Sequence, residues 1–261
     1  MEHVEFGQTG LTVSRLSFGT GTNGWGGRSE QTGLGLEGLA ELLCAAYERG
    51  VTFWDAADGY GSHAHIARAL QSVPRDKVVL ATKTTSHSGR AVRRDVERFL
   101  RELQTDVLDV VLLHCVTSEN WPRRKKSEME ALARAKEEGL VRAVGISCHS
   151  LGALRAAVAC DWADVVLARI NRKGVNMDGR PEQVAPLLER LYDAGKAVYG
   201  MKVLGVGRLA HDSRAAIQYV LGLGTVHALT VGISQLAHLR QNVRLIEELA
   251  PLYPLHEPIV L

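Results

Sequence analysis

The chain has 261 residues, which is enough for one large domain or two small ones. Its 31 basic and 29 acidic residues leave a formal charge of +2, so nucleic acid is not an expected partner. The hydrophobic content of 46% is typical of a globular protein, and no apolar run approaches the ~20 residues that a membrane helix needs. Composition therefore disfavours both a nucleic-acid-binding and a membrane-spanning chain.

The cysteines and the first residues bear on the cellular compartment. Cys44, Cys115, Cys148 and Cys160 form no Cys-x-x-Cys pair and are too few for a disulfide framework. Such usage fits a reducing compartment. The start of the chain also lacks the basic and apolar regions of a signal peptide. We therefore expect a cytoplasmic protein.

Short apolar runs alternate along the chain with longer runs at helical spacing. In chain order, the pattern predicts a β-hairpin over 4–13, and then strands over 15–20, 52–56, 78–83, 107–114, 143–147, 165–170, 197–201 and 228–231. The predicted helices cover 36–49, 63–70, 89–103, 125–138, 151–159, 181–194, 214–223 and 235–249. Eight strand–helix units favour an α/β fold of the (β/α)8 TIM barrel type, as one domain over 1–261 with an N-terminal hairpin.

Four polar side chains end or follow three neighbouring predicted strands. Asp55 ends the second strand, and Tyr60 lies in the loop after it; Lys83 ends the third strand and His114 the fourth. The carboxyl ends of all strands meet at the rim of a barrel where active sites lie. Each residue alone has an ordinary structural explanation, but together they are poor choices for ending apolar strands without a partner. We therefore expect a catalytic site at this rim.

These four groups suit the reduction of a carbonyl. Hydride added to the carbonyl carbon leaves negative charge on the oxygen, which must receive a proton. Tyr60 can donate it if the Lys83 ammonium lowers the pKa of the phenol, which is ordinarily about 10. A buried Lys83 needs a carboxylate beside it, which Asp55 can supply, and His114 can hydrogen-bond the carbonyl oxygen.

Motifs along nearly the whole chain resemble those of the aldo-keto reductase family. They are the segment 6–16, the stretch from Asp55 to Tyr60, Lys83 between two threonines, His114 after two leucines, and the segments 145–147 and 232–242. The resemblance implies an NAD(P)H-dependent oxidoreductase that acts on a small carbonyl compound. It also implies Tyr60 as the general acid, Lys83 and Asp55 as the groups that tune it, and His114 as the group that orients the substrate.

By the same resemblance, the cofactor is NADPH, with NADH as the alternative, and it lies extended across the barrel mouth. No metal is expected. Cys148 stands where the family usually has Asn, and Met201 where an aromatic residue commonly stacks on the nicotinamide. Among the matching positions near a 2′-phosphate, only Arg240 is permanently charged and His238 is partly so, which predicts a modest NADPH preference. The implied cofactor-binding residues are Gly19, Thr20, Ser147, Cys148, Asn171, Met201, Lys202, Leu204, Gly205, Ser234, His238, Arg240, Gln241 and Asn242.

Three other interpretations compete with this one. The glycines of 19–24 satisfy the G-x-G-x-x-G spacing of a Rossmann fold, but a further glycine-rich loop follows them instead of a helix. A non-catalytic nicotinamide-binding regulator on the same barrel is disfavoured because all four catalytic residue types are present. A metal-dependent hydrolase would leave Tyr60 and Lys83 without roles; its candidate ligands are Asp55, Asp58, His63, His65 and His114.

The residues that would set substrate specificity are less distinctive. The basic residues Arg169, Arg172 and Lys173 follow the sixth strand and are either a solvated loop, which we favour, or a binding site for an acidic substrate. The tail over 251–261 is short and apolar. A compact chain of this kind predicts an open site suited to small or varied carbonyls.

Overall fold

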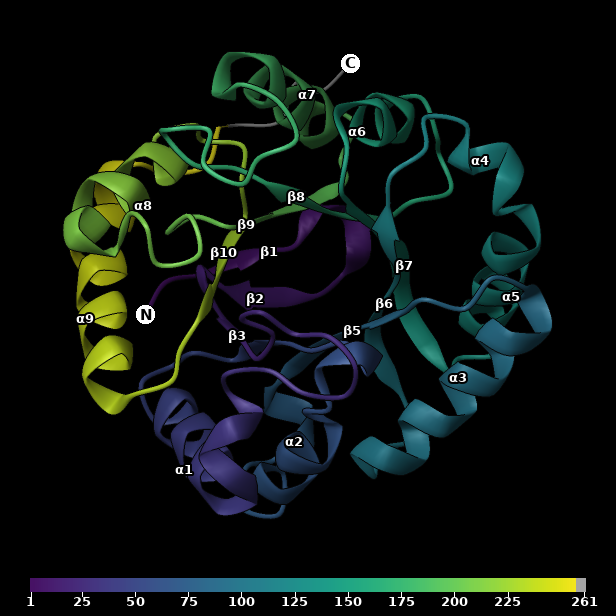
Figure 1. Cartoon of the computed structure of the whole chain (residues 1–261), viewed down its shortest axis with the longest axis horizontal. Coiled ribbons are helices and arrows are strands. Elements are labelled where there is room, and N and C mark those ends of the chain that lie inside the picture. The colour runs from purple at the N-terminus through teal and green to yellow at the C-terminus, as the bar shows by residue number, and fades with distance from the viewer. Residues whose placement is uncertain (257–261) are drawn as a thin grey trace.

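The computed structural model describes residues 1–256, and the end of the predicted apolar tail, 257–261, lies outside them. A closed barrel of eight parallel strands forms the centre, as Figure 1 shows, and confirms the predicted fold class. Each strand pairs with its neighbour along the chain, and the last pairs with the first. The barrel strands are β3 (Leu16–Gly19), β4 (Phe53–Asp55), β5 (Val79–Thr84), β6 (Leu108–Val116), β7 (Val141–Cys148), β8 (Val165–Arg169), β9 (Ala197–Met201) and β10 (Ala228–Gly232).

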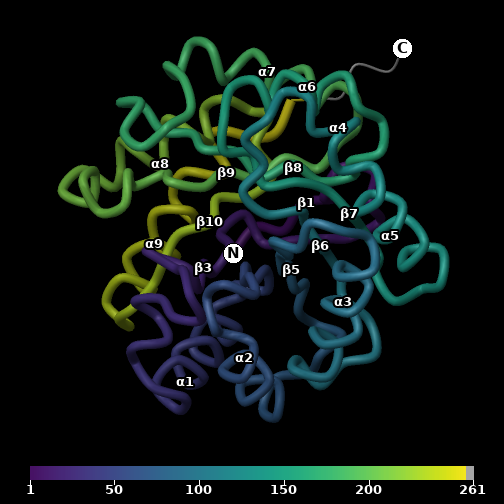
Figure 2. The backbone as a smooth tube through the Cα atoms, turned by 45° about the vertical axis from the view of Figure 1, so that its right-hand side comes forward, coloured from purple at the N-terminus to yellow at the C-terminus, as the bar shows by residue number. Residues whose placement is uncertain are grey.

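Helices surround the barrel, and the two views in Figures 1 and 2 show them as an outer ring. The predicted helix over 125–138 begins one residue late, because Lys125 has non-helical dihedral angles and separates it from a short preceding helix. No helix in the described part of the chain has the length and apolar character needed to cross a membrane. The helices are α1 (Gly35–Tyr47), α2 (His63–Ala69), α3 (Gly89–Leu103), α4 (Trp121–Arg124), α5 (Lys126–Glu137), α6 (Leu151–Val158), α7 (Pro181–Asp193), α8 (Ser213–Leu221) and α9 (Leu236–Leu249).

The predicted N-terminal hairpin is present as β1 (His3–Glu5) paired antiparallel with β2 (Thr12–Ser14). Phe6, in the connection between the two strands, is fully buried and packs at the edge of the rings of Phe53 and Tyr199, with centroids 5.3 and 5.9 Å away. Both partners are barrel-strand residues that point into the interior. The hairpin therefore closes the end of the barrel opposite the carboxyl ends of the strands.

Alternation along the strands divides the apolar side chains into two layers. In β4, Phe53 belongs to the barrel interior and Trp54 to the layer between barrel and helices. The next residue, Asp55, therefore faces the interior again. The same alternation turns Lys83 inward two positions after Ala81, and it turns His114 inward two positions after Leu112. The period-two pattern thus brings three of the four predicted catalytic residues to one inner layer.

A β-bulge interrupts this alternation near the end of β6. The pairing of β6 with β7 shifts register between Leu113 and Val116, and Cys115 has a φ of 55°, in the left-handed region. Leu113 and Val116 both lie in the outer layer although three positions separate them. The extra residue allows His114 and Cys115 both to face the barrel mouth, as bulges beside functional sites commonly do.

Candidate active site

Asp55 and Lys83 form a buried ion pair at the floor of the barrel mouth. The Lys83 Nζ lies 2.7 and 2.8 Å from the two carboxylate oxygens and 2.6 Å from the carbonyl oxygen of Ala56. Lys83 has no exposed surface and Asp55 only 4%. Burial lowers the pKa of the Lys83 ammonium, and the Asp55 carboxylate opposes that change. The structure thus brings together the acid and the amine predicted to lie side by side.

Tyr199 is a third member of this buried group, and sequence reasoning missed it. Its hydroxyl donates a 2.9 Å hydrogen bond to Asp55 Oδ1, from an inward position in β9 with no exposed surface. A tyrosine at an inner position of an otherwise apolar strand was the available signal, because a buried phenol needs a hydrogen-bond partner. Asp55 is therefore held from two sides, by Lys83 and by Tyr199.

Tyr60 lies above the ion pair, in the short 3-10 helix Asp58–Tyr60 that follows β4. Its hydroxyl is 3.4 Å from His114 Nε2, and the Lys83 Nζ is 5.0 Å from the centre of its ring. Two glycines of the β3–α1 loop pack on this ring: a Cβ added to Gly21 or to Gly24 would overlap its atoms. The glycines of 19–24, which have the Rossmann spacing, therefore belong to a loop that fixes the position of the phenol.

The structure corrects one prediction about Tyr60. Burial, strengthened by the negative charge of Asp55, raises the pKa of Tyr60 well above 10, whereas the sequence led us to expect a lowered value. The reason is that the three N–H groups of Lys83 are directed to Asp55 and to the Ala56 carbonyl. The ion pair faces the phenol as a nearly neutral unit, so it does not stabilise the phenolate. Tyr60 is therefore a neutral phenol throughout the neutral pH range.

His114 is neutral as well. Burial, with additional repulsion from Lys83 and His149, lowers its pKa from 6.5 to about 2. Its Nδ1 is buried and has no hydrogen-bond partner among residues 1–256, while Nε2 faces the Tyr60 hydroxyl. A neutral imidazole beside a neutral phenol can hydrogen-bond an uncharged carbonyl oxygen without placing a fixed charge on it.

A second group of polar side chains lies beside His114, and one of its members, His149, was missed from the sequence. The His149 ring centre is 6.0 Å from that of His114. The Arg169 guanidinium donates to His149 Nδ1 at 2.6 Å, so the ring proton resides on Nε2, which donates to Ser147 Oγ at 3.1 Å. Burial and the nearby positive charges lower the pKa of His149 to about 3. The residue directly after β7 carried the signal, since this histidine follows Ser147 by two positions.

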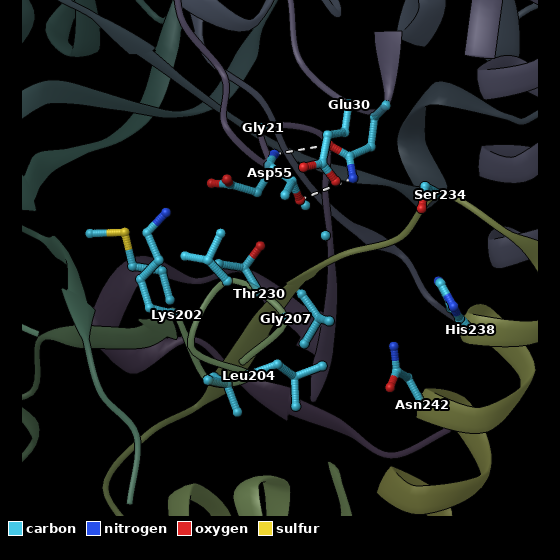
Figure 3. A pocket seen from close by; sticks show the side chains of 18 of the residues that line it. Gly21, Glu30, Asp55, Lys202, Leu204, Gly207, Thr230, Ser234, His238 and Asn242 are labelled. Atoms are coloured by element: carbon cyan, nitrogen blue, oxygen red, sulfur yellow. Dashed lines mark hydrogen bonds between the residues drawn. The ribbon is translucent and has the colours of Figure 1, made fainter. Parts of the chain in front are cut away.

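A cavity of about 270 Å³ opens beside the ion pair, near the lower end of the usual size of ligand pockets. Figure 3 shows Asp55 and Lys202 at one end of the cavity and His238 and Asn242, on α9, at the other. Tyr60 also lines it. The cavity therefore connects the predicted catalytic residues with the first turns of the last helix.

Eight of the fourteen implied cofactor residues line this cavity. They are Gly19, Met201, Lys202, Leu204, Ser234, His238, Gln241 and Asn242. Sequence reasoning missed Glu30 and Gln31, of the β3–α1 loop, and Leu167, of β8, which line it too. Gln31 is tied to the loop by hydrogen bonds with Thr22, drawn in Figure 3.

The other six lie elsewhere, for identifiable reasons. Thr20 and Asn171 are fully buried, and their side chains form local hydrogen bonds. Thr20 bonds to the Asp55 carbonyl and to Ser62. Asn171 bonds to its own loop and to the Lys202 carbonyl. Ser147 is buried beneath His149, and Gly205 lies beneath the cavity wall. Cys148 packs in the outer hydrophobic layer, where alternation after Ser147 places it.

Arg240 is the sixth, and its position removes the geometric support for the predicted phosphate contact. His238, Gln241 and Asn242 line the cavity from one face of α9. At about 100° per residue, position 240 falls on a different face, where Arg240 is exposed. His238 is thus left as the ionisable side chain at this end of the cavity.

The candidate ligands of the metal-hydrolase alternative are not brought together. His63 is bonded to Glu102 and Thr82 in the outer layer, and Asp58 is paired with Arg98. The structure does gather His114, Cys115 and His149, whose donor atoms lie within 4.8 Å of one another. However, the lone pair of His149 Nδ1 already accepts from Arg169. This group is therefore poorly suited to a cation.

The barrel and its inward-facing residues define a class of TIM-barrel oxidoreductases. Residues 15–219 match the family model described as "Aldo/keto reductase family", and the chain belongs to that family, whose members act on carbonyls with NAD(P)H. The predicted family is confirmed.

Several relatives show how far the similarity extends. Aldo-keto reductase YhdN of Bacillus subtilis is 32% identical over 171 residues, which cover 58% of this chain and 48% of that protein. The L-galactose dehydrogenase of Arabidopsis thaliana is 24% identical over 292 residues, which cover 94% and 88%. A solved structure of a protein assigned to the aldo-keto reductases, from Pseudomonas aeruginosa, has a TM-score of 0.80 and 27% identity, with 94% of each chain covered. The match spans about half the length of some curated relatives.

Proposed function

We propose that this protein reduces the carbonyl group of a small aldehyde or ketone with NAD(P)H, and that Tyr60 is the proton donor. The observation that carries the proposal is the contact between the Tyr60 hydroxyl and His114 Nε2, 3.4 Å apart, above the Asp55–Lys83 ion pair. These two groups offer a proton donor and a hydrogen-bonding imidazole at one point of the barrel mouth, and a carbonyl oxygen needs both.

The roles of the residues follow from their protonation states. Tyr60 and His114 are both neutral, so either can donate a hydrogen bond to an uncharged carbonyl oxygen. As negative charge develops on that oxygen, the phenol transfers its proton to it, since an alkoxide is far more basic than a phenolate. The Asp55–Lys83 ion pair lies next to the resulting phenolate and presents little net charge to it. The raised pKa of Tyr60 keeps the phenol in the protonated form that carbonyl reduction requires.

The cavity fits a nicotinamide cofactor. When bound, such a cofactor supplies the hydride. Three consecutive residues of the loop after β9, Gly205 to Gly207, have positive φ values of 57°, 56° and 83°, a backbone conformation that can direct N–H groups toward an anion such as a pyrophosphate. Recognition of the nicotinamide carboxamide is weaker than in the family pattern, because Cys148 stands where the family usually has Asn and is turned away from the cavity.

The preference between NADPH and NADH depends on the residues at the far end of the cavity. His238 is the ionisable group there that a 2′-phosphate could meet, and Glu30 also lines the cavity. We propose that NADPH is the cofactor with a modest preference, less than the ~100-fold that two well-placed cations could give.

The four cysteines are free, and the cytoplasmic location stays a prediction.

The test is Tyr60→Phe with two readouts. Carbonyl reduction should fall on the order of a hundredfold or more, as expected for loss of a general acid. The dissociation constant of NADPH, measured by fluorescence titration, should stay unchanged, because the variant keeps the ring that packs on Gly21. Unchanged turnover would remove Tyr60 from its role, and a lost cofactor affinity would point to a structural one.

A further inference from the structure

Lys202 is a charged side chain held in an unusual conformation at the catalytic end of the cavity. It follows directly after β9 with a φ of 62°, in the left-handed region that non-glycine residues rarely adopt. Figure 3 shows its side chain on the same side of the cavity as Asp55. Such backbone strain persists only where the surrounding structure enforces it. Here it places an ammonium group in the cavity wall.

The other charges around this point are compensated, but that of Lys202 is not. Lys83 is paired with Asp55, and Arg169 is paired with Asp178 at 2.8 Å. Within residues 1–256, the Lys202 ammonium has neither an ion pair nor a side-chain hydrogen bond. Its pKa is lowered by burial first and by the Arg169 charge second. Lys202 is therefore a basic side chain of the cavity wall without an ion-pair partner, to which an anion can bind.

The three basic residues at the end of β8 and in the loop after it differ in their surroundings. Arg169 points toward the barrel mouth, two positions after the inward-facing Leu167, and its Nε is buried without a partner among the described residues. Arg172 forms an ion pair with Asp212, and Lys173 is exposed. Arg169 thus belongs to the site, whereas Arg172 and Lys173 lie in the solvated loop that we expected.

We propose that the carbonyl substrate carries a carboxylate group, which the Lys202 ammonium binds beside the Arg169–His149 pair. This inference rests on the proposed function and names its substrate class. Lys202 and Tyr60 line the same cavity, so one small molecule can contact both. A carboxylate carries a single negative charge that matches the single uncompensated cation, whereas a phosphate would bring nearly twice that charge.

The alternative occupant of Lys202 is the cofactor itself, through its pyrophosphate. Lys202 lies on the same side of the cavity as Asp55, which is paired with Lys83 (Figure 3). The positive-φ segment Gly205 to Gly207 lies farther along the loop and can bind the pyrophosphate through its backbone. The geometry therefore favours the substrate, and the two occupants can be distinguished experimentally.

The experiment compares each acid with its neutral methyl ester. The probes are pyruvate with methyl pyruvate and 4-carboxybenzaldehyde with methyl 4-formylbenzoate, which place the carboxylate near and far from the carbonyl. In at least one pair, kcat/KM should favour the acid on the order of tenfold or more. Lys202→Met should remove this preference, by lowering kcat/KM for the acid more than kcat/KM for the ester. Lys202→Arg should restore part of it.

Lys173→Met is the matched control, because it removes one positive charge from the same region at an exposed position, and the acid-to-ester ratio should not change. Esters reduced as well as or better than acids in both pairs would overturn the inference and leave carbonyl reduction intact. A weakened NADPH affinity in Lys202→Met, with an unchanged ratio, would overturn it in favour of the cofactor. If no probe is reduced with either NADPH or NADH, the proposed function fails as well.

Discussion

The Lys83 ammonium donates to both carboxylate oxygens of Asp55, so the two charges nearest to the catalytic phenol cancel each other at short range. A lone ammonium at this position would make Tyr60 a stronger acid. The pair does not, and the burial of the phenol then decides its pKa. The Asp55–Lys83 pair is better described as a rigid neutral floor for the site than as a device that acidifies Tyr60.

A first prediction concerns the dependence of carbonyl reduction on pH. The donating form of Tyr60 is the protonated one, and its raised pKa keeps that form populated well above neutral pH. The pKa of His114, about 2, keeps the imidazole neutral on the acid side. We expect kcat at saturating substrate and cofactor to change little between about pH 6 and about pH 9. An alkaline decline near neutral pH that disappears in Tyr60→Phe would show that Lys83 lowers the pKa of the phenol after all.

A second prediction tests the packing of the β3–α1 loop on the catalytic ring. A Cβ at Gly21 would overlap the Tyr60 ring, so Gly21→Ala should displace the phenol and lower kcat/KM on the order of 10- to 100-fold. Gly33→Ala is the control, since Gly33 belongs to the same loop and a Cβ there meets no atom within 4 Å. Circular dichroism should show both variants folded. Equal kcat/KM values for Gly21→Ala and Gly33→Ala would mean that the loop can move away from the Tyr60 ring without displacing it.

Tyr199→Phe forms the third prediction. The substitution removes the hydroxyl that donates to Asp55 and leaves the packing of the ring largely intact. Hydrogen bonds to charged groups contribute about 1.5–3 kcal/mol, so the free energy of unfolding in urea should fall by about that amount. Tyr219→Phe is the control, because its hydroxyl has no hydrogen-bond partner in the described part of the chain and its removal should change stability little. An unchanged free energy of unfolding in Tyr199→Phe would mean that water replaces the lost donor.

The fourth prediction concerns cofactor choice. Arg240 is exposed and lies off the cavity, so Arg240→Ala should leave the dissociation constants of both NADPH and NADH unchanged. His238→Gln should reduce the NADPH preference and spare NADH, because it removes the ionisable group at this end of the cavity. Fluorescence titrations with each cofactor measure both. Loss of NADPH affinity in Arg240→Ala would show that α9 turns or shifts when the cofactor binds.

The barrel and the inward positions of three of the four predicted catalytic residues followed from periodicity. Asp55, Lys83 and His114 each occupy an inward position on neighbouring strands, and strand alternation is visible in sequence because it depends only on the order of residues. The same reasoning on α9 separates Arg240 from His238, since the two point to different faces of one helix. The family positions alone do not contain this helical phase.

Other features depend on which groups meet in space, and local patterns do not encode them. The hydrogen bonds of Lys83 are satisfied by Asp55 and by a backbone carbonyl, so its effect on Tyr60 could not be derived from the presence of an amine nearby. His149 and Arg169 come from different strands and acquire their relationship only when the barrel closes. The bulge at Cys115 likewise arises from the pairing of two strands rather than from the residue itself.

The closing hairpin has a practical consequence for protein engineering. Phe6 packs on Tyr199, and Tyr199 holds Asp55, so only two contacts separate the sealed end of the barrel from the reaction centre. Shortened forms that lack the first strand, or fusions that pull on it, would therefore alter turnover from the face of the molecule that no substrate reaches. Purification tags on this protein are better attached elsewhere, and random mutagenesis for altered activity should include the hairpin among its targets.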